Sequence, residues 1–231
     1  MDKKLSAFTA FLIAFAAVLM HFFNLLPKSA IYISFADDKD IQKCVYLTFD
    51  DGPSDRVTPL ILDVLDEENV KATFFIIGQN AELRKNIVRR EFESGHTVAV
   101  HSYSHEYKEI YSSPDALVKD INKCNDVIYS ITGKRSGVYR FPGGSYGLSA
   151  PLIEAVSGLG MRYVDWNASV RDAEIWNATP KQLFEAAVTT SSDLNNIVLL
   201  CHDSTTKSTT AQALKSIIRY YKNKGYVFAT F

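Results

Sequence analysis

The chain has 231 residues, of which 47% are hydrophobic and 22% are charged, which fits one ordinary globular domain with a sizeable core. Its 25 Lys and Arg against 26 Asp and Glu give a net charge of -1, so no global field favours a nucleic-acid partner. The cysteines Cys44, Cys124 and Cys201 are odd in number and do not indicate a disulfide scaffold, and we interpret them as small apolar core or helix residues.

The N-terminal segment departs from this average composition. After two lysines near the start, no charged side chain appears until Lys28, and the stretch Ala10–Met20 is the most apolar. That stretch has the length of a signal-peptide core, whereas the uncharged span Leu5–Pro27 is long enough to cross a bilayer, which takes about 20 residues. Residues 1–36 are therefore predicted to be a signal anchor or signal peptide with a linker. An uncleaved anchor is favoured, because small residues suited to cleavage do not closely follow the core.

From residue 37 onward, short apolar runs alternate with helical patterns. Seven strands are predicted by runs rich in strand-forming residues: Cys44–Phe49, Thr73–Ile77, Thr97–Val100, Val138–Phe141, Met161–Trp166, Asn196–Cys201 and Tyr226–Thr230. Apolar residues at helical spacing predict the helices Thr58–Asn69, Asn80–Ser94, Pro114–Thr132, Ser149–Leu159, Pro180–Thr190 and Thr209–Lys224. This alternation predicts an α/β fold, with residues 37–231 forming a mostly parallel sheet that closes into a barrel and carries its site at the carboxyl ends of the strands.

Two adjacent carboxylates, Asp50 and Asp51, end the first predicted strand, which Gly52 and Pro53 stop. Neighbouring carboxylates repel, so a site that keeps both ionised usually contains a cation. The same residues also suit an ordinary turn, since Asp, Gly and Pro all favour turns. The choice between a cation site and a turn therefore depends on the other strand ends.

His101 and His105 follow the third predicted strand. Their spacing predicts that they lie on one face of a helical turn, close enough to hold one ion. With a carboxylate from another strand end they would form a His, His, Asp set, which suits zinc in a site that keeps one position open. Iron, cobalt or nickel would suit the same donors.

Arg140 and His202 mark two more strand ends on the predicted rim. Each alone fits a structural role, as an ion-paired arginine or as a hydrogen-bonded core histidine. Together with the first two strand ends, they supply the kinds of groups that metal-assisted hydrolysis requires. The presence of such groups at four strand ends favours an active site over four separate structural roles.

Four segments carry a resemblance to a known family: Thr48–Pro53, His101–His105, Arg140–Gly144 and Leu200–Asp203. In this order they resemble the motifs of the NodB-homology polysaccharide deacetylases, carbohydrate esterase family 4, over about residues 43 to 231. The resemblance implies a distorted (β/α) barrel, in agreement with the strand count. It also implies metal-dependent removal of acetyl groups from N-acetylated sugars or, in some members, from O-acetylated ones.

Matched position by position, the resemblance implies three metal ligands: Asp51, His101 and His105. Asp50 would be the general base, and Arg140 would orient it and hold it ionised. His202 would protonate the leaving amine, with Asp172 keeping the imidazole charged and oriented. Two residues would contact the acetyl group, Gly143 through its N–H at the oxyanion and Leu200 by lining the pocket for the methyl.

One position departs from the family pattern. Many members have Trp after the Asp of the fourth motif, whereas this chain has Ala173. Trp166 or Trp176 would have to supply the aromatic wall of the acetyl pocket, unless both are core aromatics.

We therefore expect an exported, membrane-anchored and metal-dependent hydrolase, with zinc favoured over cobalt, nickel or iron. Its expected substrate is N-acetylglucosamine-containing polysaccharide, such as peptidoglycan or a chitin-like glycan. An O-acetyl esterase acting on xylan-like polymers remains open, since ester and amide hydrolysis share the same metal and base. If the chain were a non-catalytic carbohydrate-binding protein, we would expect the base, a metal ligand or the acid to be lost. The chain retains all of them.

Overall fold

The computed structural model describes residues 42–231. The predicted membrane anchor and the predicted domain boundary after residue 36 both lie outside the described residues. Within the described part, no helix is long and apolar enough to cross a membrane.

The described chain forms one parallel sheet of eight strands: β1 (Cys44–Asp50), β2 (Thr73–Ile77), β3 (Thr97–Ser102), β4 (Val138–Tyr139), β5 (Arg162–Tyr163), β6 (Ala168–Ser169), β7 (Asn196–His202) and β8 (Val227–Ala229). Seven follow the order β5-β4-β3-β2-β1-β7-β6. The eighth, β8, pairs with the first half of β1, while β2 pairs with its second half. Within residues 42–231, β5 and β6 do not pair with each other, so the curved sheet is an open half-barrel.

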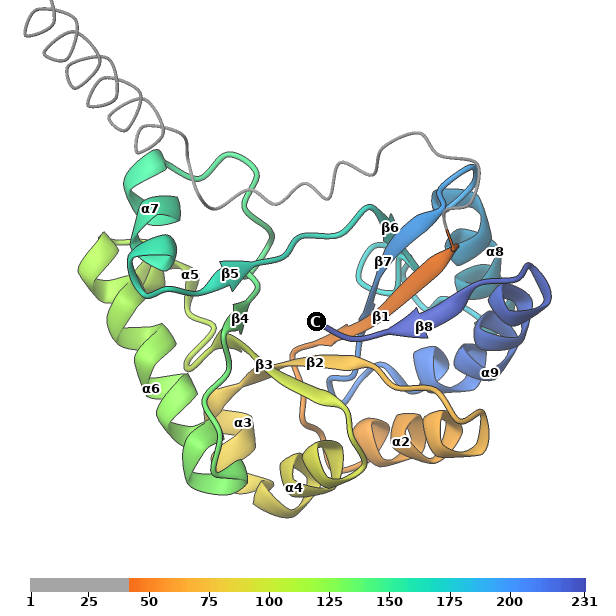
Figure 1. Cartoon of the computed structure of the whole chain (residues 1–231), viewed down its shortest axis with the longest axis horizontal. Coiled ribbons are helices and arrows are strands. Elements are labelled where there is room, and N and C mark those ends of the chain that lie inside the picture. The colour runs from red at the N-terminus through yellow and green to blue at the C-terminus, as the bar shows by residue number, and fades with distance from the viewer. Residues whose placement is uncertain (1–41) are drawn as a thin grey trace, which may run out of the picture. The chain divides into compact units, whose positions relative to one another are not determined.

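The helices lie around the outer side of this curved sheet (Figure 1). They are α2 (Val57–Glu67), α3 (Gly78–Leu83), α4 (Lys85–Glu93), α5 (Tyr107–Ile110), α6 (Pro114–Thr132), α7 (Ala150–Gly158), α8 (Pro180–Thr190) and α9 (Ser208–Asn223). Alternate residues of β1, such as Val45, Leu47 and Phe49, are fully buried in the main core. Since side chains alternate along a strand, the intervening residues face the inside of the half-barrel.

The inside of the half-barrel is apolar at one end and polar at the other. A small cluster of Phe75, Ala99 and Val138 packs with Phe231, whose ring stacks on Tyr46 at 4.5 Å. Further along β1, Thr48 and Asp50 are also buried, but both hydrogen-bond the guanidinium of Arg140. The polar end coincides with the carboxyl ends of the strands.

The predicted α/β fold with a parallel sheet is confirmed, and the three cysteines are free, with Cys124 and Cys201 buried. The predicted closure into a barrel is wrong. The strand expected over Met161–Trp166 is reduced to β5, because the Arg140 side chain binds the backbone carbonyls of Val164 and Asp165, which a longer strand could have used for pairing. The single helix expected over Asn80–Ser94 is also wrong, because the chain breaks at Arg84 into α3 and α4.

Candidate active site

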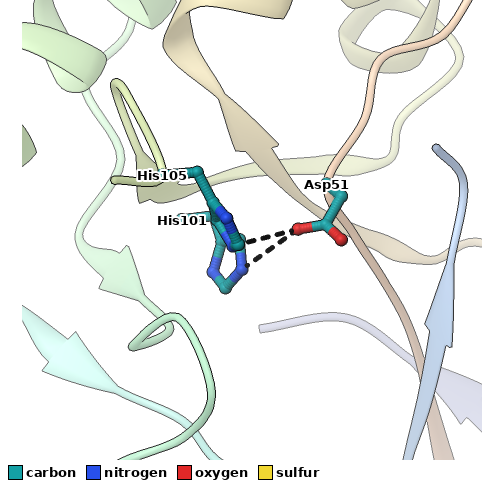
Figure 2. A group of neighbouring side chains, drawn as sticks. All are labelled: Asp51, His101 and His105. Atoms are coloured by element: carbon teal, nitrogen blue, oxygen red, sulfur yellow. Dashed lines mark ion pairs between the residues drawn. The ribbon is translucent and has the colours of Figure 1, made fainter. Parts of the chain in front are cut away.

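Asp51, His101 and His105 converge at the carboxyl ends of β1 and β3 (Figure 2). The Oδ1 atom of Asp51 lies 3.5 Å from Nε2 of His101 and 3.3 Å from Nε2 of His105. One ligand atom from each residue lies within 4.8 Å of the others. Two imidazole nitrogens and one carboxylate oxygen are a donor set that zinc and similar divalent ions accept, so these residues fit a metal.

The two histidines do not lie on a helical turn, and that prediction is wrong. His101 is still in strand β3, and His105 follows a bend in which it adopts a φ of 60°. The bend is organised by Asp120 of α6, whose carboxylate accepts the backbone N–H groups of Tyr103 and Ser104 and both neighbouring serine hydroxyls. The imidazoles meet because a distant carboxylate folds the loop between them.

The backbone of Arg140 sets the tautomer of His101. The Nδ1–H of His101 donates to the Arg140 carbonyl at 2.8 Å, so Nε2 is the ring nitrogen that faces Asp51. A hydrogen bond from the other ring nitrogen commonly orients a metal-binding histidine in this way. Arg140 thus supports the ligand set through its backbone.

The charges of the triad are strongly coupled. Burial would raise the pKa of Asp51, but its contact with His101 and the nearby imidazoles lower it to about 2. Burial lowers the pKa of His101, yet Asp50 and Asp51 raise it above its ordinary value. Burial and the charge of His101 lower the pKa of His105, which favours the neutral imidazole that a metal binds. A cation would therefore displace mainly the His101 proton.

Asp50 and Arg140 form a fully buried ion pair beside the triad. The Arg140 side chain is 0% exposed, and its Nη1 donates to Asp50 Oδ1 at 2.8 Å and to the Thr48 hydroxyl at 2.7 Å. Its guanidinium also lies over the Phe75 ring, 4.2 Å from the centroid. The other oxygen of Asp50, Oδ2, lies 4.0 Å from Nε2 of His101 and so faces the triad. This oxygen is placed to accept a proton from a water molecule there.

His202 and Asp172 form a second dyad at the end of β7. The Nδ1–H of His202 donates to Asp172 Oδ1 at 2.7 Å, while Oδ2 accepts the His202 backbone N–H and the Thr210 hydroxyl. Burial opposes the charged imidazole, but Asp172 and the carboxylates of Asp50 and Asp51 raise the pKa of His202 to about 9. His202 is therefore a cation at neutral pH and carries a proton on Nε2.

Gly143 follows β4, and Leu200 lies near the end of β7. Gly143 occupies an exposed turn with a φ of 77°, and its N–H makes no hydrogen bond within residues 42–231. Leu200 lies two residues before His202 on β7, so both side chains face the same side of the sheet. Trp166 lies against Gly144, and its ring is 5.7 Å from the Arg140 guanidinium, whereas Trp176 is 89% exposed.

Asp203 was not predicted as a residue of the site. Asp203 is fully buried, accepts the Thr58 hydroxyl at 2.5 Å and packs against Gly52 in the Asp50–Pro53 turn. Burial and the neighbouring carboxylates raise the pKa of Asp203 to about 7. Its place directly after His202 in the fourth segment was the one available hint.

Tyr107 and Tyr111 were also missed. The Tyr107 ring packs edge-on against His105, with centroids 5.2 Å apart, and Tyr111 donates its hydroxyl hydrogen to the Pro142 carbonyl at 2.7 Å. Tyr107 begins the helix α5 and Tyr111 directly follows it, and a helix of four residues is too short to be predicted from periodicity.

Comparisons with known proteins identify the family of this chain. The polysaccharide deacetylase family matches residues 37–164 of the chain. YheN of Bacillus subtilis is 35% identical over 192 residues, and the peptidoglycan-N-acetylglucosamine deacetylase PgdA of Listeria monocytogenes is 33% identical over 190 residues. These alignments cover 80% and 81% of this chain but span only 66% of YheN and 38% of PgdA.

A solved structure gives the same result for the fold. The catalytic domain of peptidoglycan N-acetylglucosamine deacetylase from Eubacterium rectale superposes with a TM-score of 0.76 at 36% identity. The superposition covers 86% of this chain and 93% of that domain. The family match, the sequence identities and the shared fold show that this chain belongs to the NodB-homology polysaccharide deacetylases, carbohydrate esterase family 4.

Proposed function

We propose that this chain is a metal-dependent deacetylase that removes N-acetyl groups from N-acetylglucosamine-containing polysaccharide, with peptidoglycan as the favoured substrate. The observation that carries the proposal is the pair of dyads, Arg140–Asp50 and Asp172–His202, at the ends of adjacent strands beside the Asp51, His101 and His105 triad. A base and an acid next to a metal-ligand set are the groups that amide hydrolysis needs.

The chain's residues divide the reaction between them. A divalent cation held by the triad would polarise the acetyl carbonyl and make a water molecule more acidic. Asp50 Oδ2 accepts the proton of the attacking water while Arg140 holds the carboxylate in place. The free N–H of Gly143 donates to the carbonyl oxygen as negative charge develops there. His202 then gives its Nε2 proton to the leaving nitrogen as the bond to the acetyl carbon breaks.

The charged state of His202 favours an amide over an ester. An amine leaves an acyl group only after its nitrogen has been protonated, whereas an alcohol is a much better leaving group. The carboxylate of Asp172 raises the pKa of this imidazole, to about 9 in the metal-free protein, and so favours the protonated acid that amide cleavage requires. The names of the relatives PgdA and the Eubacterium rectale domain support the same substrate class.

The test is acetate release by the purified chain, stripped of metal and then reloaded with zinc or cobalt. The substrates are N-acetylglucosamine oligomers, peptidoglycan and acetylated xylan. Metal-dependent release from the first two is expected. Release from xylan alone would replace the proposal with an O-acetyl esterase, and glycan binding without release would replace it with a binding protein.

We also propose, from the sequence alone, that residues 5–27 anchor the chain in the membrane with residues 37–231 on the extracytoplasmic side. The uncharged, apolar character of that segment supports the proposal. Fractionation of cells that produce the full chain is the test. Recovery of the full-length chain in the membrane fraction, accessible to external protease, is expected, and recovery in the cytoplasm would contradict it.

A further inference from the structure

We infer that Tyr107 is a further catalytic residue whose hydroxyl donates a hydrogen bond to the acetyl carbonyl oxygen beside the N–H of Gly143. The inference rests on the proposed deacetylase function and adds a side-chain donor to that site. Tyr107 begins the short helix α5, two residues after the metal-ligand candidate His105.

The first observation is the contact between Tyr107 and Gly143. A Cβ built on Gly143 would lie 3.2 Å from both the hydroxyl oxygen and Cε1 of Tyr107. The phenol therefore fills the space that a side chain at position 143 would take. Its hydroxyl lies beside the turn whose N–H is free to bind a substrate oxygen.

The second observation is the contact between Tyr107 and His105. The two rings meet edge to face, with centroids 5.2 Å apart, so the phenol lies between a ligand of the triad and the Gly143 turn. An acetyl carbonyl that approaches the triad and the Gly143 N–H together must enter this space. The Tyr107 hydroxyl makes no hydrogen bond within residues 42–231, and the residue is 46% exposed, so the donor is free and accessible to substrate.

Tyr111 fixes this arrangement from the next turn of the chain. Its hydroxyl group donates a hydrogen bond to the carbonyl of Pro142, and its ring packs against the ring of Tyr107 with centroids 5.8 Å apart. The α5 segment is thereby joined to the Pro142–Gly143 turn by a hydrogen bond and by a packing contact. Tyr111 is a positioning residue, since it acts on the site through Pro142 and Tyr107.

The test is the variant Tyr107→Phe, which keeps the ring and its contacts with His105 and Gly143 but removes the hydroxyl. A donor to the developing negative charge acts mainly in the transition state, so its loss lowers kcat and leaves KM nearly unchanged. Removal of a donor of this type costs roughly 10² to 10³ in rate at a fully enclosed site, and we expect about tenfold at this half-exposed one. Tyr129→Phe is the matched control, because Tyr129 is 51% exposed on α6 and its ring faces Arg135.

Two substrates separate a contact with the acyl group from one with the sugar. The fall in kcat is expected both with N-acetylglucosamine oligomers and with 4-nitrophenyl acetate, which has an acetyl group and no sugar. Sodium acetate, used as a competitive inhibitor, is expected to bind Tyr107→Phe more weakly, while bound zinc and the melting temperature stay at the wild-type values.

The outcomes distinguish the inference from the function on which it rests. Wild-type protein that releases no acetate would overturn the proposed function itself. Active wild-type protein with an equally active Tyr107→Phe variant would overturn the role of Tyr107 alone. A rise in KM with unchanged kcat, or a loss confined to the sugar substrate, would also overturn it.

Discussion

Asp50 and His202 occupy paired positions at the carboxyl ends of the adjacent parallel strands β1 and β7. Paired positions of neighbouring strands lie about 4.8 Å apart and direct their side chains to the same face. An aspartate and a histidine this close would ordinarily pair with each other. Here each has its own counter-charge, Arg140 for Asp50 and Asp172 for His202, so the base and the acid keep separate roles.

The first prediction concerns the pH dependence of His202. Because its pKa is raised to about 9 in the metal-free folded protein, the imidazole is protonated at neutral pH there, and the alkaline limb of kcat in the metal-loaded enzyme should lie below pH 9. The same shift stabilises the fold, fully so below the ordinary histidine pKa of about 6.5, and this stability is lost as the pH rises through about 9. NMR titration of the metal-free protein should find the imidazole pKa directly, and a bound divalent cation should lower it.

The second prediction tests the origin of that shift with Asp172→Asn. Loss of the Asp172 carboxylate removes the main group that raises the pKa of His202 against burial, so that pKa should fall and the alkaline limb should move to lower pH. A fall of the pKa from about 9 to the ordinary 6.5 would lower the protonated fraction of His202 at pH 8 about 30-fold, and the rate should fall with it. Thr210→Val is the control, since it removes one hydrogen bond to Asp172 and keeps the charge, and its limb should move by less than about one pH unit. A pH profile unchanged in Asp172→Asn would exclude Asp172 as the cause.

The third prediction concerns the buried ion pair. Arg140→Met leaves the Asp50 carboxylate buried without a partner, which should cost about 3 to 5 kcal/mol of unfolding free energy. Adding Asp50→Asn removes the unpaired charge, so the double variant should melt at a higher temperature than Arg140→Met alone. The exposed pair of Arg135 and Asp126 offers a control, because Arg135→Met should cost less than about 1 kcal/mol. Simple addition of the two single effects would show that the pair is not coupled.

The sequence was most informative where a buried strand ends in polar residues. Apolar runs predicted β1, β2 and β7 to within two residues, and the side chains after them, Asp50 and His202, fall in the site as expected. Parallel strands all end at the same rim, so residues far apart in the chain could be assigned to one place from pattern alone. This is why all three predicted metal ligands lie together.

The remaining features depend on tertiary contacts that no local pattern carries. The bend that brings His101 and His105 together is set by Asp120 on α6, and the break between α3 and α4 lies at Arg84, which pairs with Asp55 across the fold. The strand β6 has two residues, which is too short for any periodicity. Tyr107 gains its role only from its contact with Gly143.

The fourth prediction concerns metal binding. Zinc at about 100 times its dissociation constant should stabilise the wild-type protein by about 2.7 kcal/mol. Asp50→Asn should keep this effect and lose turnover, because the three ligands remain and the base does not. His105→Ala should lose both. Zinc affinity should also fall as the pH drops, since Asp50 and Asp51 raise the pKa of His101 and its proton competes with the metal. Equal zinc-induced melting shifts in wild type and His105→Ala would contradict the proposed ligand set.

The last prediction concerns the turn that carries Asp50 and Asp51. A Cβ on Gly52 would overlap the carboxylate of Asp203, which is itself held by the Thr58 hydroxyl, so Gly52→Ala must displace one of the two. Overpacking of this kind should cost about 1 to 3 kcal/mol, and the displaced turn should weaken zinc binding through Asp51.

Gly137→Ala is the matched control, because a Cβ there meets nothing within 4 Å. The double variant Gly52→Ala/Asp203→Ala lacks the Asp203 carboxylate that the Cβ would overlap. Its loss of unfolding free energy should be less than the sum of the losses in the two single variants, because the overlap exists only while both groups are present. The melting temperature and the zinc affinity are measured for Gly52→Ala, Asp203→Ala, the double variant and Gly137→Ala. If Gly52→Ala were as stable as Gly137→Ala and bound zinc as tightly as the wild type, then Asp203 would move aside freely and could not be what fixes the turn.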